Sequence, residues 1–152
     1  MSAPSSFVIK TVETLQEREQ AFEVRRQVFQ VEQGVSAKEE FDDYDDTALH
    51  IVVLDQDQGV ATARIRSLGL DEGAKRAKIE RMAVLAPYRG LSVGRNMMDF
   101  ILGHLIQQDF TEAKLHAQLQ AQGFYERLGF IAQDPVFEEA GIPHRVMTRS
   151  LP

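Results

Sequence analysis

The stretch from Ile79 to Arg95 reads Ile-Glu-Arg-Met-Ala-Val-Leu-Ala-Pro-Tyr-Arg-Gly-Leu-Ser-Val-Gly-Arg, and it carries the pattern that decides the fold. Its first half is rich in apolar residues and has the length of a β-strand. Pro87 ends that strand because proline has no N–H to donate to a sheet ladder. A helical pattern begins at about Val93, directly after a loop of small residues. The stretch therefore predicts a strand, a tight loop and a helix in succession.

The loop from Arg89 to Gly94 has the physical properties of an anion site. Glycines let backbone N–H groups approach a ligand closely, and the first turn of a helix presents N–H groups that have no partner within the helix. Arg89 adds a formal positive charge at the same place. The spacing matches neither G-x-x-x-x-G-K-[ST] nor G-x-G-x-x-G followed by an acidic residue about twenty positions on. We expect this loop to hold a phosphate group.

Two motifs in this order resemble those of the GNAT superfamily of N-acetyltransferases. The loop from Arg89 to Gly94 resembles the acetyl-CoA loop R/Q-x-x-G-x-G/A, with Ser92 in place of the first glycine. Serine is small and can cap the helix that follows. The run from Gln118 to Phe130 reads Gln-Leu-Gln-Ala-Gln-Gly-Phe-Tyr-Glu-Arg-Leu-Gly-Phe and resembles the signature N-x-x-A-x-x-[FL]-Y-x-x-x-G-F. The resemblance covers nearly the whole chain.

The composition is that of one ordinary globular domain, with 152 residues, 43% of them hydrophobic and 26% charged. No apolar run reaches the roughly 18 residues of a membrane span. Without cysteine, the chain has no disulfide, thiolate nucleophile or thiolate zinc site. The net charge of −6 argues against nucleic acid or an anionic membrane as the main partner. Residues 1–6 lack the form of a signal peptide. We expect them to be a disordered tail before a single domain over residues 7–152, in the cytoplasm.

Strand and helix patterns alternate in the order βα-βββ-αβ-αββ. The predicted strands cover 7–12, 48–54, 60–66, 75–85, 114–119, 130–132 and 144–149. The predicted helices run from a capping box of Thr14 and Glu17 to about Gln33, from Val93 to about Phe110, and from Gly123 to Leu128. Turns are expected at 55–59 and 68–74, and a loop at 134–143.

The second long helix should turn its apolar side toward the core, namely Met97, Met98, Ile101, Leu102, Leu105 and Ile106. The strand after it can lie parallel to the strand before it, through a right-handed crossover. This order matches the GNAT fold that the resemblance implies. We expect an α+β, three-layer αβα-type fold, with a mixed, mostly antiparallel sheet and helices on both faces.

In GNAT enzymes the fourth and fifth strands separate, the pantetheine arm lies in the gap like an added strand, and the pyrophosphate rests on the loop. The residues that the resemblance assigns to the coenzyme are Met82, Ala83, Val84, Arg89, Gly90, Leu91, Ser92, Val93, Gly94, Arg95, Gln118 and Phe124. Arg95 can also be interpreted as an exposed helix charge. Gln118 stands where the family commonly has asparagine, and its amide keeps both a donor and an acceptor.

Acetylation of an amine makes two chemical demands, because the ammonium must lose a proton and the departing thiolate must be stabilised. Tyr125 lies at the family's tyrosine position, so the resemblance makes it the general acid or hydrogen-bond donor to sulfur. The residues alone, without the resemblance, favour interpreting Tyr125 as an amphipathic core aromatic beside Phe124 and Phe130.

Glu80 is the first candidate for the base. Strand alternation would place it on one face with Met82 and Val84, where a partly apolar surface should raise its pKa. The alternatives are a salt bridge with arginines such as Arg64 on the adjacent strand, and a chain of water molecules as the proton acceptor. His116 shares its parity with Gln118 and could shuttle a proton, or it could be a packed strand histidine.

The segment from Lys38 to Asp46 holds six carboxylates. It can be interpreted as a solvated connecting loop, or as an acidic lip that attracts a cationic amine. A divalent-metal site is a third interpretation, although the spacing differs from that of a calcium loop.

Together these patterns predict an acetyl-CoA-dependent N-acetyltransferase that acts on a primary amine by direct transfer in a ternary complex, without a metal. The absence of cysteine excludes a covalent acetyl-cysteine route. The alternative is a non-catalytic acyl-CoA-binding or protein-interaction module on the same fold. The amine acceptor stays open among a small amine, an antibiotic, a polyamine and a protein amine. The family resemblance is also compatible with a homodimer.

Overall fold

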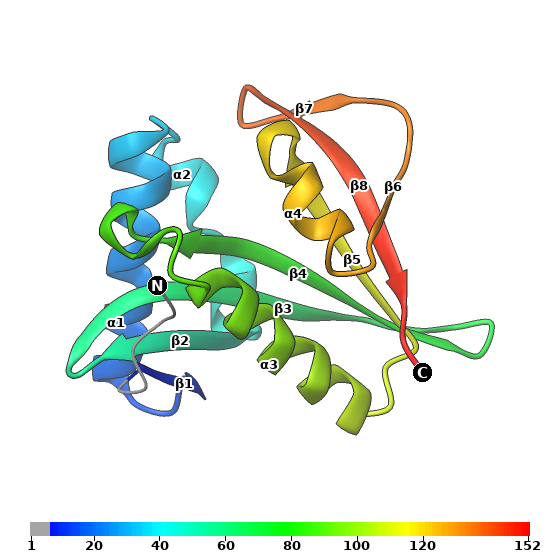
Figure 1. Cartoon of the computed structure of the whole chain (residues 1–152), viewed down its shortest axis with the longest axis horizontal. Helices are drawn as coiled ribbons and strands as arrows, with labels where there is room; N and C mark the ends of the chain where they lie inside the picture. The colour runs from blue at the N-terminus through cyan, green and yellow to red at the C-terminus, as the bar shows by residue number, and fades with distance from the viewer. Residues whose placement is uncertain (1–6) are drawn as a thin grey trace.

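The structure is a computed structural model that describes residues 7–152 (Figure 1), so the predicted tail at residues 1–6 lies outside the described part. An eight-stranded sheet has the order β1-β2-β3-β4-β5-β8-β6, with β7 paired to β8. The strands are β1 (Phe7–Thr11), β2 (Leu49–Asp55), β3 (Gln58–Asp71), β4 (Ala74–Val84), β5 (Glu112–Gln118), β6 (Ile131–Ala132), β7 (Phe137–Glu139) and β8 (Ile142–Ser150). Among the strands of residues 7–152, only β4 and β5 pair in parallel, so the prediction of a mixed, mostly antiparallel sheet is confirmed.

The helices are α1 (Leu15–Arg25), which continues as a π-helix (η1, Arg26–Glu32), α2 (Ala37–Glu40), α3 (Val93–Gln107) and α4 (Gln122–Glu126). Short 3₁₀ turns η2 (Asp43–Asp46), η3 (Ala86–Tyr88) and η4 (Leu119–Ala121) join them to the strands. The predicted capping box is present at the start of α1, where Thr14 and Glu17 satisfy each other's backbone N–H groups. None of the helices within residues 7–152 combines the length and apolar character needed to span a bilayer.

Helices cover both faces of the sheet. On one face α3 buries Met97, Met98 and Ile101 against side chains that alternate along the strands, such as Ile51 and Ile79. On the other face Val24 of α1 and Val28 of η1 pack on Ala83. Strand alternation thus gives β3 and β4 one row of side chains toward α3 and another toward α1, as the αβα arrangement requires.

A β-bulge in β4 interrupts this alternation. Arg64 pairs with Glu80 and Thr62 pairs with Ala83, so two residues of β4 oppose one residue of β3. Arg81, within the bulge, has φ +53°, a left-handed conformation that costs a non-glycine residue about 1–2 kcal/mol. Because the bulge adds one residue, the side chains beyond it change face.

The bulge makes one expectation wrong. Met82 and Val84 pack with the core on the α3 face, whereas Glu80 bonds to Arg64 and Arg66 on the α1 face. The alternation that would have placed Glu80 beside Met82 and Val84 does not survive the extra residue.

Beyond the bulge, β4 and β5 separate. Their parallel pairing covers Arg76 to Ile79 on β4 and Glu112 to Leu115 on β5, and it ends there. Figure 1 shows the two strands diverging from this point, with α4 beside the far end of β5. The edge of β4 after Ile79 therefore faces an opening rather than a neighbouring strand.

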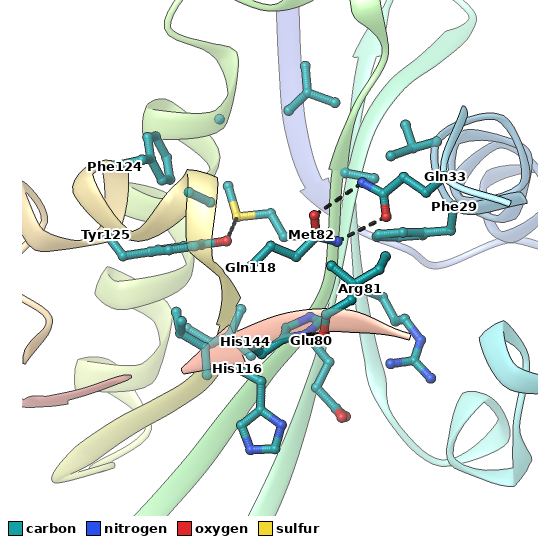
Figure 2. Close-up of a pocket in the computed structure, with 18 of the residues that line it drawn as sticks. Phe29, Gln33, Glu80, Arg81, Met82, His116, Gln118, Phe124, Tyr125 and His144 are labelled. Atoms are coloured by element: carbon teal, nitrogen blue, oxygen red, sulfur yellow. Dashed lines mark hydrogen bonds between the residues drawn. The ribbon is translucent and has the colours of Figure 1, made fainter. Parts of the chain in front are cut away.

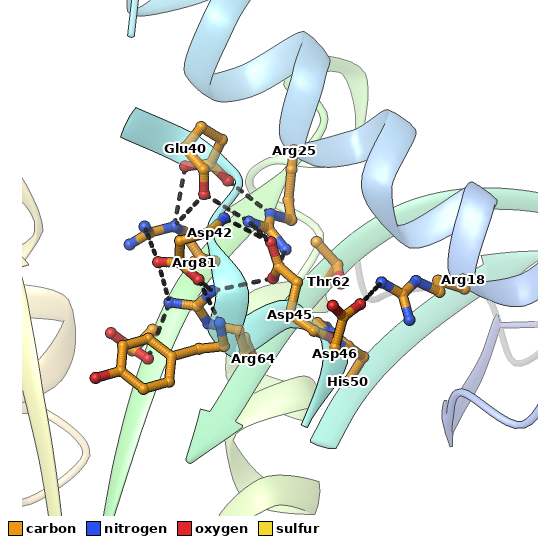
Figure 3. A network of polar contacts seen from close by, with 12 residues as sticks. Arg18, Arg25, Glu40, Asp42, Asp45, Asp46, His50, Thr62, Arg64 and Arg81 are labelled. Atoms are coloured by element: carbon orange, nitrogen blue, oxygen red, sulfur yellow. Dashed lines mark hydrogen bonds and ion pairs between the residues drawn. The ribbon is translucent and has the colours of Figure 1, made fainter. Parts of the chain in front are cut away.

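Buried ion pairs fix the segment from Lys38 to Asp46, called the acidic segment below, onto the sheet (Figure 3). Arg25, 1% exposed, donates to Glu40 and Asp45, each at 2.6 Å. Arg64, also 1% exposed, reaches Asp45 at 3.0 Å and Asp42 at 2.7 Å. Since buried charges persist only when paired, these arginines and carboxylates require one another. The interpretation of this segment as a solvated loop holds only in part, because Glu39, Asp43 and Asp46 are exposed whereas Glu40 and Asp45 are buried.

The same network holds the bulge. The Arg81 guanidinium donates to the backbone carbonyl of Glu40 at 3.0 Å and to Asp42 at 3.3 Å. A strained backbone conformation persists where its surroundings over-determine it. The acidic segment thus helps to maintain the separation of β4 from β5.

Four other details differ from the sequence-based expectations. β3 continues to Asp71, so the turn predicted at 68–74 shrinks to Glu72 and Gly73. The loop predicted at 134–143 contains β7, which pairs with β8. The helix α3 ends at Gln107, and Ile106 is 36% exposed rather than directed into the core.

Candidate functional site

A groove of about 1040 Å³ opens where β4 and β5 separate. One wall is the end of β4, from Glu80 to Val84, with η1 and the acidic segment behind it. The opposite wall comes from β5, α4 and the β7–β8 hairpin, and the loop before α3 closes one end. Figure 2 shows side chains from these elements pointing toward one another.

The loop at the end of the groove contains two residues with a left-handed backbone conformation. Gly90 and Ser92 both have left-handed φ angles, +81° and +63°. Ser92 is the N-cap residue of α3, but its side chain makes no capping hydrogen bond, so the expected serine cap is wrong. Ser92 instead takes the conformation for which the motif uses glycine. The N–H groups of the first turn of α3 lack helical partners, as at any helix start.

Arg89 lies at the junction of this loop and β4. Its Nε donates to the carbonyl oxygen of Val84 at 2.9 Å, and its Nη2 donates to Glu32 at 2.9 Å. The Leu85 N–H bonds back to Val60 on β3, so strand alternation turns the backbone groups of Val84 toward the groove. Arg89 and the β4 edge are therefore parts of one polar surface. Arg95 is exposed on the first turn of α3.

Gly94 brings three of the expected coenzyme contacts together. A Cβ atom at this position would lie 3.5 Å from Met82, 3.6 Å from Val84 and 3.6 Å from Phe124. The missing side chain thus leaves room between α3, β4 and α4. Leu91, by contrast, packs against the core and does not line the groove.

Ala83 lines the groove, but its side chain packs on Val24 and Val28 on the α1 face. Gln118 of β5 forms a pair of amide hydrogen bonds with Gln33, at 2.9 and 3.4 Å, that joins the two walls (Figure 2). Gln33 follows the π-helix, a form often found at functional sites. Sequence reasoning placed Gln33 only at a helix end, and no local signal pointed to this contact.

Tyr125 is a packed aromatic, as one interpretation of the sequence predicts, and its hydroxyl also makes a hydrogen bond. Its ring packs in T-shaped contact on Phe124 and Phe130, with centroids 5.0 and 6.0 Å apart. Its hydroxyl donates to the Met82 sulfur at 3.2 Å across the groove (Figure 2). Desolvation raises the pKa of Tyr125, so the hydroxyl keeps its proton at neutral pH. Tyr125 is a packed aromatic whose donor already points at a sulfur atom.

The pKa of Glu80 is lowered, whereas the sequence led us to expect a raised pKa. Its carboxylate is 7% exposed and is held by Arg66 at 2.5 Å, Arg64 at 3.1 Å and Lys78 at 3.1 Å. Burial alone would raise the pKa of Glu80, but the hydrogen bond from Arg66 and the charges of Arg64 and Lys78 outweigh it and lower this pKa to about 2. The expected raised pKa is wrong, and the salt-bridge alternative describes the side chain.

His116 has a partner that the sequence did not reveal. Its Nδ1 lies 2.9 Å from the Glu139 carboxylate, and its ring meets Phe137 edge to face at 5.0 Å. Glu139 belongs to β7, within the segment predicted to be a loop, so only the tertiary fold brings the pair together. Among residues 7–152, no three His, Cys, Asp or Glu side chains form a group that could hold a metal ion.

Comparison with known proteins agrees with this geometry. The family model of the acetyltransferase (GNAT) domain matches residues 13–151. The uncharacterized protein YyaT of Bacillus subtilis (strain 168) is 37% identical over 146 residues, which cover 94% of this chain and 95% of that protein.

Solved structures also match over nearly the full chain. An N-acetyltransferase candidate from Lactobacillus plantarum has a TM-score of 0.87 at 28% identity, covering 97% of this chain and 100% of that chain. An acyl-CoA N-acyltransferase from Pseudomonas aeruginosa has a TM-score of 0.79 at 29% identity, covering 94% and 97%. The sequence motifs, the separated strands and these matches lead to one conclusion: the chain belongs to the GNAT acetyltransferase family.

Proposed function

We propose that this protein is an acetyl-CoA-dependent N-acetyltransferase that transfers the acetyl group directly to a primary amine. The observation that carries the proposal is the end of β4–β5 pairing at Ile79 and Leu115, which opens a groove that ends at the loop expected from the sequence to hold a phosphate. An open strand edge next to a helix start suits a ligand with amides at one end and a pyrophosphate at the other. The cytoplasmic location expected from the sequence belongs to the same proposal.

The residues present fit this co-substrate. The backbone groups of Met82 and Val84 would pair with pantetheine amides, and Arg89 with the first turn of α3 would hold the pyrophosphate. Gly94 leaves the space between β4 and α4 that the arm needs. When bound, acetyl-CoA supplies an activated thioester, and the backbone N–H of Val84 would polarise its carbonyl.

Tyr125 would stabilise the departing thiolate. Its hydroxyl already donates to the sulfur of Met82, and a coenzyme sulfur in this part of the groove would compete for the same donor. Thiols ordinarily titrate near 8.5, below the raised pKa of Tyr125, so donation of a hydrogen bond is easier than complete loss of the phenol proton. Tyr125 would then act chiefly by hydrogen bonding to sulfur.

Glu80 would serve as a countercharge rather than as the base. A carboxylate whose pKa is about 2 has little affinity for the proton of an alkylammonium ion. Its negative charge instead balances Arg64 and Arg66 at the bend of β4. The amine therefore needs another proton acceptor.

Calorimetric titration with acetyl-CoA tests the proposal. The wild-type protein should bind, and Arg89→Ala should weaken binding about tenfold or more, since a hydrogen bond to a charged group contributes about 1.5–3 kcal/mol. The matched control is Arg76→Ala, which removes a partly exposed arginine from the other end of β4. Absence of binding by the wild type would refute the proposed function.

A further inference from the structure

We infer that His116, oriented by Glu139, is the general base that deprotonates the amine acceptor. This inference rests on the proposed N-acetyltransferase function and names a catalytic residue for it. The side chains that carry it are the imidazole on β5, the carboxylate on β7 and the packing of Phe137 against the ring.

The position of His116 follows from the strand geometry. It comes directly after Leu115, the last residue of β5 that pairs with β4, so it lies where the groove begins. Leu115 and Ala117 point into the core on the α3 face, and alternation directs His116 to the α1 face with Glu80. Its side chain is 19% exposed and lines the groove.

Tyr125 and His116 therefore approach the groove from opposite faces of the sheet. Tyr125 contacts Met82 on the α3 face, and His116 lies on the α1 face. This arrangement suits direct transfer, because the group that deprotonates the amine and the group that stabilises sulfur then occupy separate places around the thioester carbonyl. Figure 2 shows the tyrosine and the histidine in separate parts of the groove, with Gln118 labelled between them.

The Glu139 contact determines which nitrogen of His116 is available. The hydrogen bond from His116 lowers the pKa of Glu139, so its carboxylate is ionised at neutral pH and can only accept hydrogen bonds. The neutral imidazole must then carry its proton on Nδ1, which leaves the Nε2 lone pair free to accept a proton. A carboxylate that orients a histidine in this way is a recurring device of general-base catalysis.

The other titratable side chains at this end of the groove are less suited than His116 to accept a proton from the amine. His144 also donates from Nδ1, to the carbonyl oxygen of Ile142 at 2.6 Å, but its Nε2 lies 3.8 Å from the Glu139 carboxylate and its side chain is 8% exposed, against 19% for His116, so its free nitrogen is less accessible to an amine. Glu80 and Lys78, which face the same end of the groove from β4, are paired with each other. With its pKa lowered to about 2, the Glu80 carboxylate is too weak a base to take the proton of an ammonium ion.

The proton balance is complete without a further reactant. His116 Nε2 takes one proton from the ammonium, and the freed lone pair forms the N–C bond. The C–S bond breaks and its electron pair stays on sulfur, which accepts a hydrogen bond from Tyr125. The second proton lost by the nitrogen neutralises the thiolate, and the proton on His116 passes to solvent.

The test compares His116→Gln and Glu139→Gln with the wild type, with His104→Gln on α3, away from the groove, as the matched histidine control. Thiol release from acetyl-CoA is followed with n-butylamine, which is almost entirely ammonium at neutral pH, and with hydroxylamine, which is largely uncharged. His116→Gln should lower turnover of n-butylamine about 10²- to 10⁴-fold and that of hydroxylamine much less. Glu139→Gln should show a smaller loss of the same kind, and added imidazole should partly restore His116→Gly.

The outcomes separate this inference from the proposed function. Failure of the wild type to bind acetyl-CoA in calorimetry would refute the function itself. Normal binding and equal turnover of n-butylamine by wild type and His116→Gln would overturn only the role of His116. Nitrogen-resolved NMR of the imidazole requires no acceptor. A neutral His116 protonated at Nδ1 supports the inference, and one protonated at Nε2 overturns it even if neither amine is acetylated.

Discussion

Replacing Glu80 with glutamine distinguishes a countercharge from a catalytic base. The amide keeps the size of the side chain but removes the charge that faces Arg64, Arg66 and Lys78. Arg64 is 1% exposed and retains Asp42 and Asp45, so the variant should fold. A countercharge role predicts a large loss of stability with a small change in turnover.

The expected loss follows from the pKa of Glu80. A decrease of this pKa from the ordinary glutamate value of 4.5 to about 2 corresponds to about 3 kcal/mol, at about 1.4 kcal/mol per pKa unit. Because the folded-state pKa is lowered, this stability is fully present above the unfolded pKa and is lost as the pH falls toward about 2. Burial raises the pKa of Glu40, which acts in the opposite direction, but Glu40 is common to both proteins and largely cancels in the difference.

Urea unfolding followed by circular dichroism, at neutral pH and at successively lower pH, measures this difference. Glu80→Gln should be about 3 kcal/mol less stable at neutral pH, and the gap should close as the solution is acidified. Turnover at a temperature where both proteins are folded should stay within about tenfold. Equal stability together with a loss of turnover above about 100-fold would refute the reasoning and restore Glu80 as the base.

Three further substitutions test the groove. Tyr125→Phe should lower turnover about 10- to 1000-fold while calorimetric acetyl-CoA binding changes little; unchanged turnover would remove the hydroxyl from the mechanism. Gly94→Leu should fill the space beside Met82 and Phe124 and weaken acetyl-CoA binding at least about tenfold, with the melting temperature maintained by the better helix propensity of leucine; normal binding would mean that the arm does not pass there. Ser92→Gly should raise the free energy of unfolding by up to about 1 kcal/mol, because glycine adopts φ +63° without strain; a loss of stability would show that the serine side chain contributes unseen contacts.

Local signals predicted the parts of the fold that depend on neighbouring residues. Thr14 and Glu17 form their capping box because both groups lie within one helical turn. The loop from Arg89 to Gly94 takes left-handed angles that small residues tolerate. The crossover from β4 through α3 to a parallel β5 follows from chain order alone.

Contacts between distant segments could not be predicted in this way. The bulge occurs at Arg81, with no glycine to mark it, because the backbone of Glu40 and the carboxylate of Asp42 hold it from a separate segment. Nothing in the sequence near His116 indicated that Glu139 would be its partner, because the two residues meet only in the folded structure. The carboxylates after Ala37 look solvated in sequence, and two of them, Glu40 and Asp45, are buried because Arg25 and Arg64 converge on them from two other elements.

The most direct test of the central claim is amide hydrogen exchange at Val84, measured by NMR with and without acetyl-CoA. The Val84 backbone faces the groove, whereas Ile79 lies where β4 is paired on both sides and serves as the internal reference. If the coenzyme arm lies along the β4 edge, exchange at Val84 should slow markedly on binding while exchange at Ile79 stays nearly constant. Binding without any new protection at Val84 would contradict the account.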